Sequence, residues 1–185
     1  MGLLLIEQAF NGLQFGVMLF LIAAGLTLVF GIMDLVNLSH GSLVMVGAYL
    51  ATTLIEWTGS FILGILLALP STFLVGVVVE IVVLRTLYER DHLDQVLATF
   101  GLILFFNELI RIVWGPASLY SGLPESISGH VEILPGVPYP AFRLLIILVG
   151  LLVALLIYFI VARTKLGMLI RACLLYTSPS PRDPT

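Results

Sequence analysis

Charged residues are scarce in this chain, and cysteine is almost absent. Of its 185 residues only 10% are Asp, Glu, Lys or Arg, whereas 60% are hydrophobic and the mean hydropathy is +1.16. Soluble domains carry roughly 25% charged residues, so this composition indicates an integral membrane protein. The eight Lys and Arg residues and the net charge of -3 provide no basic face for nucleic acid.

Motifs for metal and nucleotide chemistry are missing as well. The single cysteine, Cys173, excludes an internal disulfide and a Cys-based zinc site. His40, His92 and His130 lie in separate connections, without a His-x-x-x-His or Glu-x-x-His pair. The sequence contains no Gly-x-x-x-x-Gly-Lys-Ser/Thr, so this chain by itself has no P-loop for ATP. We therefore expect no enzymatic activity and no cofactor of its own, and any energy from ATP must come from a partner.

Long apolar runs predict the fold. A spanning helix needs about 20 predominantly apolar residues, and five segments approach this length. They cover residues 13–33, 38–55, 61–84, 95–114 and 143–162. The second segment is the weakest, because it is short, begins in a polar run and contains Gly41 and Gly47. It is either a full span or a broken or re-entrant helix. The prediction is an all-α, polytopic transmembrane helical bundle.

Basic residues indicate the orientation of the spans. Those that follow the third and fifth spans are Arg85, Arg90, Arg163, Lys165 and Arg171. By the positive-inside rule both of these connections are cytoplasmic. The loop 116–141 contains no Lys or Arg, as expected for the opposite side. A full second span places the N-terminus outside and a re-entrant one places it inside, and the sequence leaves both open.

The run Asn37-Leu38-Ser39-His40-Gly41 lies between two apolar stretches. An unpaired polar group in hydrocarbon costs several kcal/mol, so these groups need partners or a polar cavity. Asn and Ser before an apolar run are good N-cap residues. Asn37, Ser39, His40 and Gly41 are also candidates to line a solute path, because the N-termini of broken helices in transporters point toward the substrate. The two roles can coexist.

Other ionisable residues lie inside predicted spans. Glu80 precedes Arg85 by five residues near a cytoplasmic helix end, which favours a structural ion pair over a proton relay. Glu108 and Arg111 are three residues apart and can form an intrahelical pair. Such a pair is either an anchor near the helix end or part of a functional site. Asn107 and Glu108 are therefore further candidates for the solute path.

The last residues have a different character. From Cys173 the chain reads Cys-Leu-Leu-Tyr-Thr-Ser-Pro-Ser-Pro-Arg-Asp-Pro-Thr, which has neither helical period nor apolar run. This string resembles translated sequencing-adapter read-through. We expect residues 1–172 to be the N-terminal part of a membrane domain and residues 173–185 to be a non-native tail. The alternative is a natural disordered C-terminus.

Short motifs follow one another along the chain in a recognisable order. They are Asn11-Gly12-Leu13-Gln14, Ala24-Gly25-Leu26-Thr27-Leu28-Val29-Phe30-Gly31, Asn37-Leu38-Ser39-His40-Gly41-Ser42, Gly47-Ala48-Tyr49, Glu80 with Arg85, Leu97-Ala98-Thr99-Phe100-Gly101-Leu102, Trp114-Gly115, Arg163-Thr164-Lys165-Leu166-Gly167 and Ile170-Arg171-Ala172. The ordered set covers nearly all of residues 8–172. It resembles the branched-chain amino acid ABC transporter permeases of the LivH type.

The resemblance implies a multi-pass permease subunit in the cytoplasmic (inner) membrane of a prokaryote. Its implied partners are a second, LivM-like permease subunit, two ATP-binding subunits and a substrate-binding protein. The segment that resembles the start of the ATPase-coupling loop contains Arg163, Thr164, Lys165, Gly167, Arg171 and Ala172. The sequence departs from the family pattern at Cys173, and at Ser42, where many members carry an acid.

The residues leave rival functions open. The leading hypothesis is a subunit that translocates branched-chain amino acids, or related amino acids and amides, by alternating access driven by partner ATPases. A self-sufficient channel or ion-coupled carrier would instead use Glu80, Glu108 and the polar run as its coupling site. A third hypothesis is an inert assembly subunit.

Overall fold

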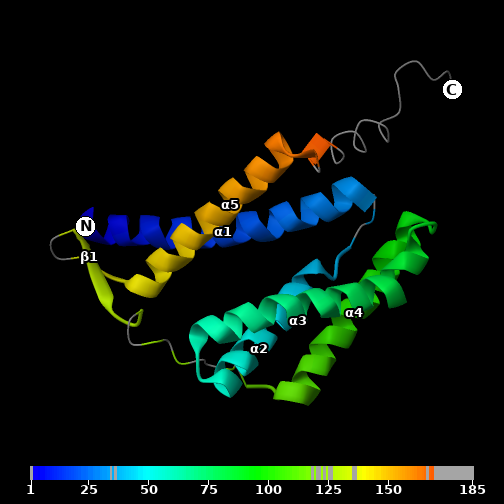
Figure 1. Cartoon of the computed structure of the whole chain (residues 1–185), viewed down its shortest axis with the longest axis horizontal. Helices are drawn as coiled ribbons and strands as arrows, with labels where there is room; N and C mark the ends of the chain where they lie inside the picture. The colour runs from blue at the N-terminus through cyan, green and yellow to red at the C-terminus, as the bar shows by residue number, and fades with distance from the viewer. Residues whose placement is uncertain are drawn as a thin grey trace. The chain divides into compact units, whose positions relative to one another are not determined.

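The computed structural model describes residues 2–33, 35, 37–117, 119, 122, 124, 127–134, 137–165 and 167–168. The helices among them are α1 (Gly2–Met33), α2 (His40–Thr58), α3 (Phe61–Val82), the short 3-10 helix η1 (Leu84–Leu87), α4 (His92–Trp114) and α5 (Ala141–Arg163). A hairpin of β1 (His130–Leu134) and β2 (Val137–Pro140) precedes α5 (Figure 1). The predicted tail, residues 173–185, lies outside the described residues.

The predicted all-α membrane fold is confirmed. Within the described residues, four helices are long and apolar enough to cross a membrane, at Leu4–Phe30, Phe61–Leu87, His92–Trp114 and Ala141–Arg163. The helix α2 is not among these four, but it is one continuous helix from His40 to Thr58 and is not broken at Gly41 or Gly47. The helix α1 begins at Gly2, before the predicted span that starts at residue 13, because Glu7 and Gln8 interrupt the apolar run but are good helix formers.

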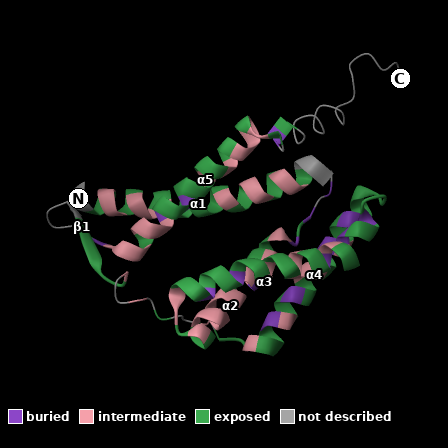
Figure 2. Cartoon of the chain, viewed as in Figure 1, coloured by how far each residue is buried: buried purple, intermediate pink, exposed green. Residues whose placement is uncertain are grey.

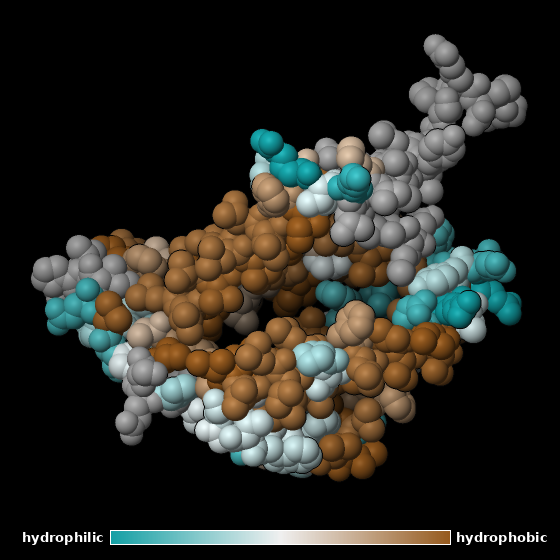
Figure 3. All heavy atoms as spheres, in the orientation of Figure 1, coloured by the Kyte–Doolittle hydropathy of each residue, from teal (hydrophilic) through white to brown (hydrophobic). Residues whose placement is uncertain are grey.

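Apolar side chains cover much of the outer surface of the helices. In Figure 3 most of the visible surface is brown, the colour of apolar residues. In Figure 2 exposed residues recur along the whole of α5. On α5 Leu155 is 63% exposed and Phe159 is 60% exposed. A soluble protein rarely exposes such large apolar patches, so these faces are suited to lipid or to other membrane helices.

The described residues form two compact units, and the first contains α1, the hairpin and α5. In this unit Asn11 Oδ1 accepts hydrogen bonds from Tyr139 Oη at 3.1 Å and from Arg143 Nη1 at 2.7 Å. Further along both helices, Gly150 lies against Val17 so closely that a Cβ at residue 150 would collide with the valine side chain. Residue numbers therefore rise along α1 as they rise along α5 from one contact to the next. The two helices run in the same direction (Figure 1).

The hairpin was not predicted from the sequence. Its antiparallel register pairs Val131 with Tyr139 and Glu132 with Pro138. The side chain of Tyr139 is fully buried, and its ring lies 5.6 Å from that of Phe10. The β-branched residues of His-Val-Glu-Ile-Leu before a Pro-Gly pair were the available signal for a strand and a turn.

The second unit contains α2, α3, η1 and α4. Gly59, with φ 64°, ends α2 in the left-handed conformation, and its N–H donates to the Ile55 carbonyl at 2.9 Å. The chain then returns as α3, where Gly64 lies directly against the backbone of Ile55 and Gly47 faces Thr72. Because residue numbers rise along α2 as they fall along α3, the two helices are antiparallel.

The helix α4 completes this unit. Its buried Phe106 and Ile110 share an apolar core that also contains Leu35, Val46, Val79, Leu84 and Leu87. Near its end, Trp114 Nε1 donates to Thr53 Oγ1 at 2.7 Å, and the Trp114 ring lies 5.4 Å from that of Tyr49. The turn that leads into α4 is held by Gln95, whose buried side chain donates to the carbonyls of Leu87 and Arg90.

Candidate functional site

The polar run before α2 forms a closed hydrogen-bonded turn. Asn37 is 3% exposed and Ser39 is fully buried. Asn37 Oδ1 accepts a hydrogen bond from the backbone N–H of Ser39 at 3.0 Å and another from the Ser39 hydroxyl at 2.6 Å. This is the arrangement of an Asx turn, in which an Asn side chain bonds the backbone two residues on. The Ser39 hydroxyl and the side-chain oxygen of Asn37 thus satisfy each other.

The predicted side-chain cap of α2 is wrong. Ser39 occupies the N-cap position, but its side chain makes no capping hydrogen bond to α2. Its hydroxyl donates to Asn37 Oδ1, on the side of the preceding turn. The backbone carbonyl of Ser39 accepts from the Leu43 N–H at 3.1 Å, which begins the helix. His40 is half-buried and Gly41 is exposed. That Asn37, Ser39, His40 and Gly41 contact a solute stays a prediction.

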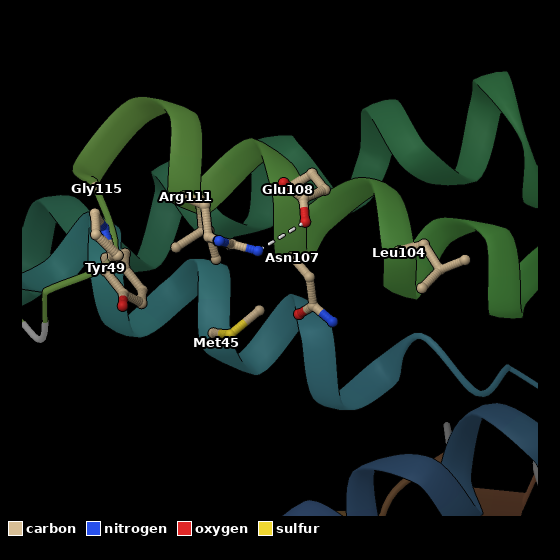
Figure 4. Close-up of a pocket in the computed structure, with 9 residues that line it drawn as sticks. Met45, Tyr49, Leu104, Asn107, Glu108, Arg111 and Gly115 are labelled. Atoms are coloured by element: carbon tan, nitrogen blue, oxygen red, sulfur yellow. Dashed lines mark hydrogen bonds and ion pairs between the residues drawn. The ribbon is translucent and has the colours of Figure 1, made fainter.

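A second group of predicted residues lines a cleft of about 450 Å³ between α2 and α4. Figure 4 shows Asn107, Glu108 and Arg111 on α4, with Asn107 pointing toward α2. The cleft is lined by Met45, Tyr49, Leu104, Asn107, Glu108, Ile110, Arg111, Gly115 and Pro116. Its polar groups come from α4 and Tyr49, and its apolar groups come from both helices.

The predicted Glu108–Arg111 ion pair is present. Arg111 Nη1 lies 3.2 Å from Glu108 Oε1, and the side chains of Arg111 and Glu108 are 65% and 63% exposed. The spacing of three residues on a helix brings the two groups together. Their exposure leaves both accessible from the cleft.

The predicted ion pair of Glu80 with Arg85 does not form among the described residues. Glu80 Oε1 instead accepts a hydrogen bond from the Tyr88 hydroxyl at 2.9 Å. The helix α3 ends at Val82, and η1 turns Arg85 outward while bringing Tyr88 back toward Glu80. Even in a continuous helix, a spacing of five residues would place the two side chains on different faces.

Desolvation and the contact with Glu80 together make Tyr88 less acidic. Desolvation of the hydroxyl, the hydrogen bond to Glu80 and the charge of Glu80 raise the pKa of Tyr88 above its ordinary value of 10.0, while Arg85 opposes this shift. Tyr88 is therefore a neutral hydrogen-bond donor at physiological pH.

The predicted coupling segment begins where α5 ends. Thr164 follows Arg163 in an extended conformation, and its Oγ1 accepts from the Gly167 N–H at 3.3 Å. A Cβ at Gly167 would collide with the carbonyl group of Val161, so this turn requires glycine. Lys165 is exposed. Arg171 and Ala172 lie outside the described residues.

The structure thus separates the predicted site residues into distinct places. Asn107 and Glu108 meet in the α2–α4 cleft, whereas Asn37, Ser39, His40 and Gly41 do not line it. Met45 and Tyr49 were missed by sequence reasoning, although Tyr49 belongs to one of the recognised motifs. No group of three His, Cys, Asp or Glu residues that could hold a metal ion is found in the described part of the chain.

Comparisons with a protein family and with individual proteins agree with each other. Residues 8–175 match the protein family described as "Branched-chain amino acid transport system / permease component". The high-affinity branched-chain amino acid transport system permease protein BraD of Pseudomonas aeruginosa is 29% identical over 181 residues, which is 91% of this chain and 58% of BraD. LivH of Escherichia coli K12, a permease protein of the same kind of system, is 25% identical over 182 residues, again 91% and 58%.

The similarity extends to an archaeal protein. The probable branched-chain amino acid transport permease protein LivH of Methanocaldococcus jannaschii is 29% identical over 170 residues, which is 84% of this chain and 50% of that protein. This chain therefore spans between half and 58% of the length of these relatives. No solved structure matches it.

Proposed function

Because this chain belongs to the family of branched-chain amino acid transport system permease components, we propose that it is a translocating subunit of an ATP-binding cassette importer. The observation that carries the proposal is the family match over residues 8–175 of an all-helical chain with strongly apolar helices. The proposed solutes are branched-chain amino acids or related amino acids and amides. The proposed location is the cytoplasmic (inner) membrane of a prokaryote.

The proposed mechanism is alternating access driven by partner subunits. The sequence has no P-loop motif, so ATP is bound by two partner ATPases. A LivM-like second permease subunit completes the pathway, and a substrate-binding protein delivers the solute. The exposed Lys165, next to the tight turn at Gly167, belongs to the segment 163–172 through which the ATPase acts on this subunit.

Uptake into proteoliposomes tests this function. The full-length protein is reconstituted with its partner subunits, and entry of labelled leucine is measured with ATP supplied or withheld. Uptake is expected to require ATP, and to stop when the P-loop lysine of the partner ATPase is replaced by alanine.

The rival function makes the opposite prediction. A self-sufficient channel or ion-coupled carrier would take up leucine along a proton or sodium gradient without ATP, with Glu80 or Glu108 as its coupling group. Gradient-driven uptake that persists with the inactive ATPase would contradict the importer. An inert assembly subunit would tolerate substitution of the polar groups of residues 37–40 without any loss of uptake.

A further inference from the structure

The α2–α4 cleft combines two opposite charges with an apolar lining. The guanidinium of Arg111 and the carboxylate of Glu108 lie side by side, and the amide of Asn107 is one helical position away from Glu108 (Figure 4). Met45 and Leu104 contribute apolar surface to the same cleft. Its volume of about 450 Å³ lies within the range of roughly 300–1,000 Å³ typical of small-molecule sites.

We propose that this cleft is a recognition site for zwitterionic α-amino acids. The Arg111 guanidinium receives the carboxylate of the ligand and Glu108 receives its ammonium group, while Met45 and Leu104 contact an aliphatic side chain. Asn107 supplies a further hydrogen bond that orients the ligand. The proposal rests on the proposed transport function and adds to it the place and the chemistry of recognition.

The hydrogen bonding of the pair leaves capacity for a ligand. A guanidinium carries five N–H donors, and the described residues give Arg111 one hydrogen bond, to Glu108. Planar, bidentate binding of a carboxylate is the interaction for which Arg is best suited. Both side chains are about two-thirds exposed, so a ligand reaches them without breaking a buried contact.

The position of the cleft also fits delivery from outside. It lies at the C-terminal half of α4, whose N-terminal end follows the basic residues Arg85 and Arg90. The positive-inside rule assigns that N-terminal end to the cytoplasm, and the C-terminal end to the opposite side. The Glu108–Arg111 pair therefore lies toward the face from which a binding protein would release its amino acid.

A charge swap distinguishes recognition from anchoring. Labelled leucine uptake is measured in proteoliposomes with the full-length protein and its partners, for wild type, Glu108→Gln, Arg111→Gln and the double variant Glu108→Arg with Arg111→Glu. A ligand-binding pair predicts that each single variant lowers the initial uptake rate about tenfold or more. The double variant is expected to stay equally low, because Asn107 and the apolar lining still hold the ligand in its original orientation.

A merely structural pair predicts a different pattern. Restoration of wild-type uptake by the charge swap, or normal uptake by both single variants, would overturn the proposal. Glu56→Gln is the matched control, since Glu56 is an exposed acid on α2 that does not line the cleft, and it is expected to transport normally. Copurification of the ATPase subunits reports assembly.

A conservative variant keeps the test informative if the charge variants do not assemble. Arg111→Lys retains the positive charge but loses the planar fork, so the apparent KM for leucine is expected to rise while the maximal rate changes less. An unchanged KM would count against the proposal. If the wild-type complex itself takes up no leucine with ATP, the proposed function fails instead.

Discussion

Asn37 and Ser39 show how a membrane chain places polar side chains at low cost. Both are buried, and a single acceptor atom, Asn37 Oδ1, satisfies two donors of Ser39. An unsatisfied buried donor costs about 1–3 kcal/mol, so the pair makes the polar run compatible with an apolar surrounding. The turn then positions the start of α2.

Replacing Asn37 removes this acceptor. Asn37→Ala is expected to lower the free energy of unfolding by about 1–3 kcal/mol, because two donors of Ser39 become unsatisfied. Ser39→Ala should cost less, since the backbone N–H still reaches Asn37 Oδ1. Thermal unfolding of the purified full-length protein in detergent measures both. Equal stability of Asn37→Ala and wild type would contradict this role.

Tyr88 is the observed partner of Glu80, a role that the sequence spacing had assigned to Arg85. Tyr88→Phe is expected to destabilise the protein by about 1 kcal/mol, because Glu80 loses its donor. Tyr158→Phe is the matched control, since Tyr158 is 69% exposed on α5. If Arg85→Gln lowered the stability as much as Tyr88→Phe does, the interpretation of Glu80 and Arg85 as an ion pair would be restored.

The raised pKa of Tyr88 gives this contact a pH dependence. A group that holds its proton more tightly in the folded state contributes stability fully below its unfolded pKa, here 10.0, and loses it as the pH rises through the folded pKa. The difference in stability between wild type and Tyr88→Phe should therefore be constant at neutral pH and shrink above pH 10.0. Unfolding midpoints measured across alkaline pH test this direction.

At the scale of elements, glycine decides how closely α2 and α3 approach. A Cβ at Gly64 would overlap the backbone of Ile55, whereas a Cβ at Gly76 on the same helix meets nothing within 4 Å. Helix pairs in membranes use small residues in this way to bring backbones together. The α2–α3 contact is therefore specified at particular positions and not by apolar character alone.

Two alanine substitutions in α3 separate packing from helix propensity. Gly64→Ala is expected to lower stability by roughly 1–3 kcal/mol, because the rigid backbone of Ile55 cannot yield to the added methyl group. Gly76→Ala should be neutral or stabilising by up to about 1 kcal/mol, since alanine favours the helix. Unfolding in detergent ranks the two variants, and an equal effect of both would exclude close packing at Gly64.

At the scale of the whole molecule, contacts between helices indicate in which direction each helix crosses the membrane. The contacts of Asn11 with Arg143 and of Val17 with Gly150 make α1 parallel to α5. The basic residues Arg163 and Lys165 assign the end of α5 to the cytoplasm. We therefore predict that the start of α1 lies outside.

The same reasoning predicts that α2 is a full span. It is antiparallel to α3, which ends on the cytoplasmic side near Arg85, so α2 runs from the cytoplasm outward. Its 19 residues extend about 28 Å, close to the roughly 30 Å of a hydrocarbon core. We therefore predict five crossings, with α2 as a full span and not a re-entrant helix.

Cysteine labelling in cells tests this topology. In full-length protein whose own cysteines are replaced by serine, a cysteine introduced at Leu4 should react with a membrane-impermeant thiol reagent in intact cells. A cysteine introduced at Arg90 or Lys165 should react only after permeabilisation. Labelling of the residue 4 cysteine only after permeabilisation would place the start of α1 in the cytoplasm and contradict the parallel arrangement of α1 and α5.

Sequence alone determined that this is a helical membrane protein of the permease family, and where its apolar helices lie. Long apolar runs and the asymmetry of Lys and Arg are local properties, so they can be read without knowing which residues touch. The Glu108–Arg111 pair was predictable for the same reason, since helix geometry alone brings residues three apart together.

Only the tertiary structure decided which distant residues meet. Tyr88 bonds Glu80 because η1 interrupts the helix, and Tyr49 shares a cleft with Arg111 because α2 packs against α4. The direction of α1 follows from contacts between residues more than a hundred positions apart, such as Asn11 and Arg143. Composition and periodicity describe each helix by itself, whereas these contacts depend on how helices pack within each unit.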